Sequence, residues 1–380
     1  MALALTLGAC ASASSGFSDV ADQVASVRAS WSQPKAAPAS VQLFVASTRR
    51  KAGEVQDGHA RFFLQSVSIP PGHKPGAIEA PRFGAPDPAE HFTLARSRAL
   101  DGNEFPAELA AHISGRVGNA RDVLVYVHGF NTSQAEARFR LAQIVADGGF
   151  AGVPVLFTWP SKGELFAYES DKEAATVSRD ALEKLLLDLA HAPGVGRVQV
   201  LAHSMGAWLT MEALRETAIA GHGDLDGKLG SVMLAAPDID LAVFRQQVSR
   251  LNASHVSVFV SRDDRALSLS SRIAGDRPRL GAMDPSRAAD AAAIDAMGVR
   301  VYDLSMLRSG FIGHDTYADA PDAVRQIGAT LTKKREADAD VQAVIGERPD
   351  PVQTAPAPIN VQNAPIIAEP LPAPAATAAK

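Results

Sequence analysis

Short apolar runs recur along the chain, and most of them are followed by segments in which apolar residues recur at helical spacing. Continuous apolar runs are typical of strands buried on both faces of a sheet, and alternating runs are typical of strands with one buried face. The runs predict eight strands, at residues 41–47, 61–69, 123–127, 153–158, 198–201, 231–235, 256–260 and 299–304.

Helix signals lie between these runs. Ser133 and Glu136 have the spacing of a capping box, and apolar residues at helical spacing follow them. Apolar residues from Ala181 to Leu189 form a second stripe, and Asp240 is expected to cap a third helix. Residues 75–101 are rich in proline, glycine and charge, and they predict a long loop.

Strands and helices that alternate along a chain predict an α/β fold with a mostly parallel sheet and helices on both of its faces. We expect this eight-stranded domain to span residues 41–331. Residues 1–40 are rich in Ala, Ser and Pro and predict a flexible leader with the remnant of a lipoprotein-like signal. Residues 332–380 are rich in Ala and Pro and predict a disordered tail.

Composition excludes several classes of function. Of the 380 residues 46% are hydrophobic, which is enough for a sizeable core, and the net charge of −5 provides no basic field for nucleic acid. The single cysteine, Cys10, allows no intrachain disulfide and no cysteine-based zinc site. The sequence shows no metal-binding cluster and no phosphate-binding loop, so we predict chemistry without a cofactor.

Cys10 has a context of its own. The segment Leu7-Gly8-Ala9-Cys10 resembles the bacterial lipobox, which predicts lipid attachment at Cys10 and a place in the cell envelope. Membrane association would then depend on this anchor alone, since no stretch approaches the ~20 apolar residues of a spanning helix. The apolar run before Cys10 is short and lacks basic residues. The alternative is a chance cysteine in a soluble protein.

The run at 198–201 leads into Ala202-His203-Ser204-Met205-Gly206, and a helical pattern follows at once. A strand, a tight turn with a serine and a helix form a nucleophile elbow, whose usual pattern is G-x-S-x-G. Ala stands here at the first glycine position. We predict that Ser204 is a nucleophile held above the carboxyl edge of the sheet.

A serine needs a base and a group that orients the base. In α/β hydrolases the acid precedes the histidine in the sequence, and His314 is the only histidine after Asp263 and Asp264. We favour Asp264 as the acid because it follows the second strand after the elbow. Asp263 and Asp238, which also lie at strand ends, remain alternatives.

The other polar residues at this edge predict supporting roles. The backbone N–H groups of Phe130 and Met205 are expected to form an oxyanion hole, with Gly129 and Gly206 at strained positions of positive φ. His128 is expected to shape the oxyanion loop, and His203 to pack at the elbow. Trp159 and Tyr168 are candidates either for an acyl pocket or for the core.

Blocks of sequence at these positions resemble the bacterial α/β-hydrolases of the domain-of-unknown-function 900 family. The resemblance covers about residues 41–331 and implies an α/β-hydrolase fold with esterase- or lipase-like activity. The blocks are Val-Tyr-Val-His-Gly-Phe-Asn (125–131), Phe-Thr-Trp-Pro-Ser (157–161), Ala-His-Ser-Met-Gly (202–206), Ala-Ala-Pro-Asp (235–238), Ser-Arg-Asp-Asp-Arg-Ala-Leu (261–267) and Gly-His (313–314).

The sequence thus predicts a serine hydrolase that cleaves small carboxylic esters or other acyl substrates through Ser204, His314 and Asp264. The same triad serves amide or peptide hydrolysis and acyl transfer, so these reactions remain alternatives. A non-catalytic envelope protein that binds ligands with a hydrolase fold is the alternative from a different class.

Overall fold

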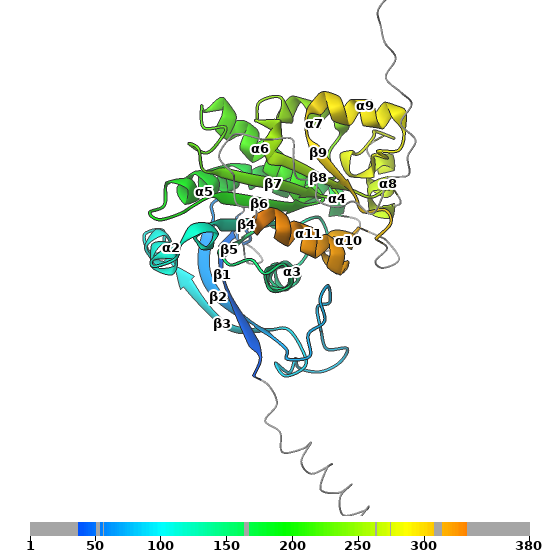
Figure 1. Cartoon of the computed structure of the whole chain (residues 1–380). Helices are drawn as coiled ribbons and strands as arrows, with labels where there is room; N and C mark the ends of the chain where they lie inside the picture. The colour runs from blue at the N-terminus through cyan, green and yellow to red at the C-terminus, as the bar shows by residue number, and fades with distance from the viewer. Residues whose placement is uncertain are drawn as a thin grey trace, which may run out of the picture. The chain divides into compact units, whose positions relative to one another are not determined.

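The computed structural model describes residues 37–50, 54–55, 57–162, 167–262, 264–273, 275–307 and 314–332. These residues form one nine-stranded sheet, with the strand order β3-β2-β1-β5-β4-β6-β7-β8-β9 (Figure 1). The strands are β1 (Ala39–Ser47), β2 (Arg61–Ile69), β3 (Thr93–Leu100), β4 (Val123–Val127), β5 (Val153–Thr158), β6 (Val198–His203), β7 (Leu229–Ala235), β8 (Val256–Val260) and β9 (Arg300–Asp303).

The sheet is mostly parallel, as predicted. Every neighbouring pair from β1 through β5, β4, β6, β7 and β8 to β9 is parallel, and only the pairings of β2 with β1 and with β3 are antiparallel. The central strands β4, β5 and β6 are buried along their whole length, which explains their continuous apolar runs. Because these three strands are parallel, their carboxyl ends meet at one edge of the sheet.

The prediction of eight strands was wrong by one. The missing strand is β3, which lies within residues 75–101, the stretch predicted as a loop. β3 is an edge strand that pairs only with β2, and six of its eight positions are exposed. Both of its faces carry polar residues, with Arg96 and Arg98 on one face and Ser97 on the other, so the alternation of apolar and polar positions that marks a strand is absent.

Helices cover both faces of the sheet. Helices α3, α10 and α11 contribute to one apolar core, and helices α2, α5, α6, α7 and α9 to the other (Figure 1). The helices are α2 (Glu104–Ile113), α3 (Gln134–Asp147), α4 (Tyr168–Val177), α5 (Arg179–His191), α6 (Met205–Ile219), α7 (Leu241–Val248), α8 (Arg265–Ile273), α9 (Ala288–Met297), α10 (Thr316–Asp319) and α11 (Pro321–Thr332).

Two predicted helix starts are confirmed by their capping contacts. At α3 the Ser133 hydroxyl accepts the Glu136 N–H, and the Glu136 carboxylate accepts the Ser133 N–H. At α7 the Asp240 carboxylate accepts the N–H groups of Ala242 and Val243. Side chains of this kind satisfy the N–H groups that the first turn of a helix leaves without partners.

Cys10, most of the predicted leader and almost all of the predicted tail lie outside the described residues, so lipid attachment and a disordered tail stay predictions. Among the helices that the structure does describe, none has the length and apolar character needed to span a membrane.

Candidate functional site: the turn after β6 and a histidine–carboxylate pair

The turn between β6 and α6 holds Ser204 in a rare backbone conformation. Its φ is 52° and its ψ is −122°. Such a conformation costs a non-glycine residue on the order of 1–3 kcal/mol and occurs mainly at functional sites. The turn is fixed because the Ser204 N–H donates to Ala235 O over 3.0 Å and Ser204 O accepts the Asp238 N–H over 3.2 Å. Ala202 lies inside β6, so the absence of the usual first glycine does not prevent the turn.

The prediction that Gly129 and Gly206 occupy positions of positive φ was wrong, since neither has one. Both glycines are needed instead for close approach. A Cβ on Gly206 would lie 2.2 Å from His128 O, and one on Gly129 would lie 2.9 Å from Ser204 Cβ. The strain belongs to Ser204 itself and to Asn131, whose φ is 54°. The glycines bring the loop after β4 against the serine turn.

Two backbone donors remain free at this contact. In the described part of the chain, the N–H groups of Phe130 and Met205 donate to no acceptor. Phe130 follows Gly129 in the loop after β4, and Met205 is the first residue of α6. Unpaired N–H groups next to a helix N-terminus favour a developing negative charge.

His314 and Asp264 form a short hydrogen bond. Asp264 follows β8 and is fully buried, and His314 lies just before α10. Nδ1–H of His314 donates to Asp264 Oδ2 over 2.6 Å, and Asp264 Oδ1 accepts the Leu267 N–H over 3.0 Å. Both carboxylate oxygens are thus engaged, and the ring is oriented with Nε2 left as its basic nitrogen.

Burial lowers the pKa of His314, but its hydrogen bond to Asp264 and the charge of Asp264 outweigh burial and raise the pKa above its ordinary value. Within the described residues the Ser204 hydroxyl makes no hydrogen bond to His314. Proton transfer between them requires a closer approach, which active sites commonly reach only with substrate bound.

Asp238, an alternative acid, is engaged elsewhere. Its Oδ2 accepts the Tyr168 hydroxyl over 2.9 Å, and its Oδ1 accepts the Ser270 hydroxyl over 2.5 Å and faces Arg279 Nε at 3.2 Å. The structure therefore pairs Asp264, and not Asp238, with His314. Asp263, the other alternative, lies outside the described residues.

His203 packs against the ring of His314. The two ring centroids are 4.6 Å apart. The ring of Tyr317 also stacks on the His203 ring, with a centroid distance of 4.6 Å. Nε2–H of His203 donates to His314 O over 3.3 Å. Burial, and then the charge of His314, lower the pKa of His203 to about 3. His203 is therefore neutral at physiological pH and supports His314, in keeping with the packing role that the sequence predicts.

His128 anchors the loop that carries Phe130. It is fully buried and stacks on Trp159, with ring centroids 5.1 Å apart. Its Nδ1–H donates to Gly129 O over 2.9 Å, and its Nε2 accepts the Thr158 hydroxyl over 3.0 Å. Burial and the charge of Arg49 lower the pKa of His128 to about 3. Trp159 is fully buried, so of the two pocket candidates it belongs to the core.

Arg49 is a residue of this site that the sequence analysis did not identify. Its guanidinium joins three strand ends by donating to Thr132 O over 2.7 Å, to Ser161 O over 2.8 Å and to Thr158 Oγ1 over 2.9 Å. Burial lowers its pKa to about 10, so Arg49 stays charged at neutral pH. The loop after β4 is therefore tied to the ends of β1 and β5 by charge-assisted hydrogen bonds.

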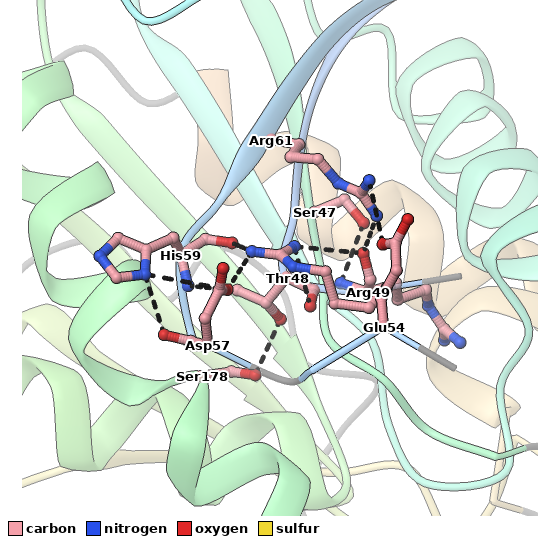
Figure 2. A network of polar contacts seen from close by, with 9 residues as sticks. Ser47, Thr48, Arg49, Glu54, Asp57, His59, Arg61 and Ser178 are labelled. Atoms are coloured by element: carbon pink, nitrogen blue, oxygen red, sulfur yellow. Dashed lines mark hydrogen bonds and ion pairs between the residues drawn. The ribbon is translucent and has the colours of Figure 1, made fainter. Parts of the chain in front are cut away.

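Figure 2 shows the polar network in which Arg49 is embedded. The Arg49 carbonyl accepts the Arg61 guanidinium over 2.6 Å, and the Thr48 and Ser178 hydroxyls lie 2.8 Å apart. Arg50, by contrast, points to Asp57 and to His59 O. These contacts fix the backbone directly after β1, from which the Arg49 side chain projects. Only the pair of basic residues directly after a strand could have indicated this role in the sequence.

A family model described as "Alpha/beta hydrolase of unknown function (DUF900)" matches residues 103–335, which is more than half of the chain. The chain belongs to this family. The matched range includes the Ser204 turn, Asp264 and His314, and it begins after β3, whereas the predicted resemblance begins at β1. A comparison with curated proteins found no match.

Solved structures of hydrolases are similar to this chain at low identity. An esterase from Pyrobaculum calidifontis is 13% identical, with 84% of this chain and 97% of that chain covered and a TM-score of 0.39. A carboxylesterase from a metagenomic library, EstE1, is 14% identical over the same shares, with a TM-score of 0.37. A CIB-like hydrolase from Thermoplasma acidophilum is 12% identical over 77% and 98%, with a TM-score of 0.36. At these values the similarities carry no argument about activity.

Proposed function

We propose that this member of the α/β-hydrolase family cleaves carboxylic esters with Ser204 as nucleophile, His314 as base and Asp264 as the residue that orients the base. The observation that carries the proposal is the 2.6 Å hydrogen bond from His314 to the buried Asp264, at the sheet edge where Ser204 is strained. The free N–H groups of Phe130 and Met205 support it, because they flank Ser204 as an oxyanion hole requires.

In the acylation step, Oγ of Ser204 attacks the ester carbonyl carbon while Nε2 of His314 takes the hydroxyl proton. The carbonyl oxygen becomes an oxyanion, which accepts the N–H groups of Phe130 and Met205. When the carbonyl re-forms, the bond to the alkoxy oxygen breaks and the imidazolium of His314 gives that oxygen the proton. Asp264 accepts the Nδ1–H of His314 and stabilises the imidazolium throughout.

In the deacylation step, His314 takes a proton from a water molecule that attacks the acyl carbon. The bond between that carbon and the Ser204 oxygen breaks, and His314 returns the proton to the serine. The products are an alcohol and a carboxylic acid, and no redox step or cofactor is needed for the balance.

The pH dependence follows from the raised pKa of His314. Its neutral form is the base, so kcat/KM for p-nitrophenyl butyrate should rise with pH, with a midpoint above the ordinary histidine value of about 6.5, and be lost as pH falls through that midpoint. Stopped assays across the pH range, with the folded state followed by circular dichroism, measure this. A midpoint well below 6.5 would contradict the assigned pair.

Arg49→Gln should lower kcat by about 10- to 100-fold with little change in KM. The reason is that hydrogen bonds from a charged group contribute about 1.5–3 kcal/mol, and their loss frees the loop whose N–H acts mainly in the transition state. The matched control is Arg50→Gln, because Arg50 contacts the partly exposed Asp57 and not this loop. Arg49 is a positioning residue, so an equal loss in both variants, or a loss confined to Tm, would refute this role.

A further inference from the structure

A cavity of about 50 Å³ lies beside the start of α6. Its wall includes Met205, whose N–H is one of the proposed oxyanion donors, and Tyr168, whose ring contacts that of Phe130 with centroids 5.5 Å apart. The cavity therefore adjoins Met205 directly, and the Tyr168 ring in its wall contacts Phe130. Side chains of its wall come from α4, α6 and the segments after β7 and α8, among them Tyr168, Lys172, Met205, Asp238, Asp240 and Arg279.

The two acidic side chains of the cavity are fully engaged. Asp238 binds the hydroxyls of Tyr168 and Ser270 and faces Arg279. Asp240 accepts two backbone N–H groups of α7 with Oδ1 and the Arg277 guanidinium with Oδ2. Each oxygen of both carboxylates therefore already has a hydrogen-bonding partner within the protein.

The two basic side chains still have free donors. The Arg279 side chain is only 6% exposed, and its Nε lies 3.2 Å from Asp238 without an aligned hydrogen bond. Its Nη2 donates to Ser270 O, and in the described part of the chain its Nη1 has no partner. The Lys172 ammonium, which is exposed, also has no ion pair or hydrogen bond among the described residues.

We propose that this cavity binds a carboxylate group of the substrate through Arg279 and Lys172, so that the natural ester is one that carries a carboxylate. This inference rests on the proposed function, since it names the substrate class of that site. A planar guanidinium with free N–H groups matches a carboxylate, and a buried arginine with unused donors is otherwise unfavourable. Lys172 at the rim adds a second positive charge.

The first experiment compares neutral and carboxylated esters. The neutral esters are p-nitrophenyl butyrate and phenyl acetate. Mono-p-nitrophenyl glutarate carries the carboxylate on the acyl side, and 4-acetoxybenzoate carries it on the alcohol side. After subtraction of spontaneous hydrolysis, at least one carboxylated ester should exceed its neutral counterpart in kcat/KM by about tenfold. The preferred ester shows on which side of the scissile bond the cavity lies.

Variants then assign the preference. Lys172→Gln should lower the ratio of carboxylated to neutral kcat/KM a few-fold, since Lys172 is exposed, and Arg279→Lys should lower it about tenfold because the guanidinium fork is lost. Lys184→Gln is the matched control, because Lys184 is an exposed lysine on α5 paired with Asp188. If Arg279→Lys does not fold, the test uses Lys172→Gln together with the wild-type protein in 0.5 M NaCl. In both cases the ratio of carboxylated to neutral kcat/KM should fall.

A binding measurement separates this inference from the proposed function. Calorimetric titration of glutarate into Ser204→Ala protein requires no catalysis, and its affinity should fall when Lys172→Gln is added. If Ser204→Ala kept its activity, the proposed mechanism would fail and the glutarate result would still be readable. The inference is overturned if neither Lys172→Gln nor Arg279→Lys changes the ester ratio or the affinity for glutarate.

Discussion

Replacing Ser204 with alanine should abolish the hydrolysis of short p-nitrophenyl esters and leave the fold intact. Loss of the nucleophile of a triad costs on the order of 10⁶-fold in kcat in a serine protease. The backbone contacts that hold the turn come from main-chain atoms of Ser204, so alanine keeps them. Initial rates with p-nitrophenyl butyrate and the Tm of the purified variant measure the two parts of this expectation.

Ser249→Ala is the matched control, because it removes an exposed hydroxyl at the end of α7 that donates to Gln246 O within the same helix end. It should keep full activity. If folded Ser204→Ala retained most of the activity, hydrolysis would proceed by another route, and the proposed mechanism would be refuted.

Asp264→Asn should lower kcat by about 10⁴-fold, as the equivalent change does in a serine protease. The local geometry gives the reason. One oxygen of Asp264 accepts the Leu267 N–H, so an asparagine would keep its oxygen there and turn its NH₂ group toward His314 Nδ1. Nδ1 would then accept a hydrogen bond, and the ring proton would move to Nε2. In that tautomer His314 is unable to take the proton of Ser204.

Two aspartates serve as comparisons for this variant. Asp263→Asn alters the neighbouring carboxylate and should affect kcat far less. Asp238→Asn should act mainly on folding, lowering the free energy of unfolding by about 3–5 kcal/mol because Arg279 would lose its buried partner. If Asp238→Asn caused the large loss of kcat and Asp264→Asn did not, the acid would belong to the strand end after β7.

The buried part of the fold could be predicted from the sequence because burial leaves a local pattern. The bounds of β2, β4, β5 and β8 match the predicted runs residue for residue. β3 could not be predicted, since an exposed edge strand is stabilised by its hydrogen bonds to β2 and carries no apolar periodicity. The strand–turn–helix at Ser204 could be located because the turn favours small residues two positions before and after the serine, here Ala202 and Gly206.

Supporting roles for His128 and His203 could be predicted from the sequence, but other supporting contacts of the site could not. Arg49 bonds to Ser161, which lies 112 positions away, and no local pattern records such a contact. The stacking of Tyr317 on His203 likewise joins residues that are far apart in the sequence, so no local pattern predicts it. Gly129 and Gly206 were predicted to serve positive φ, which they do not have; they allow the close approach of neighbouring segments, which depends on the packing of β4 against β6.

The most direct test of an activated serine uses a fluorophosphonate and intact-mass spectrometry, because it needs no knowledge of the substrate. The Ser204 oxygen should attack phosphorus and displace fluoride, so the wild-type mass should increase by one phosphonyl group, and peptide mapping should place that group on Ser204. Ser204→Ala should gain no mass, and His314→Ala should react far more slowly. A wild-type protein that remains unlabelled, or a Ser204→Ala protein that is labelled equally fast, would contradict a catalytic serine at this position.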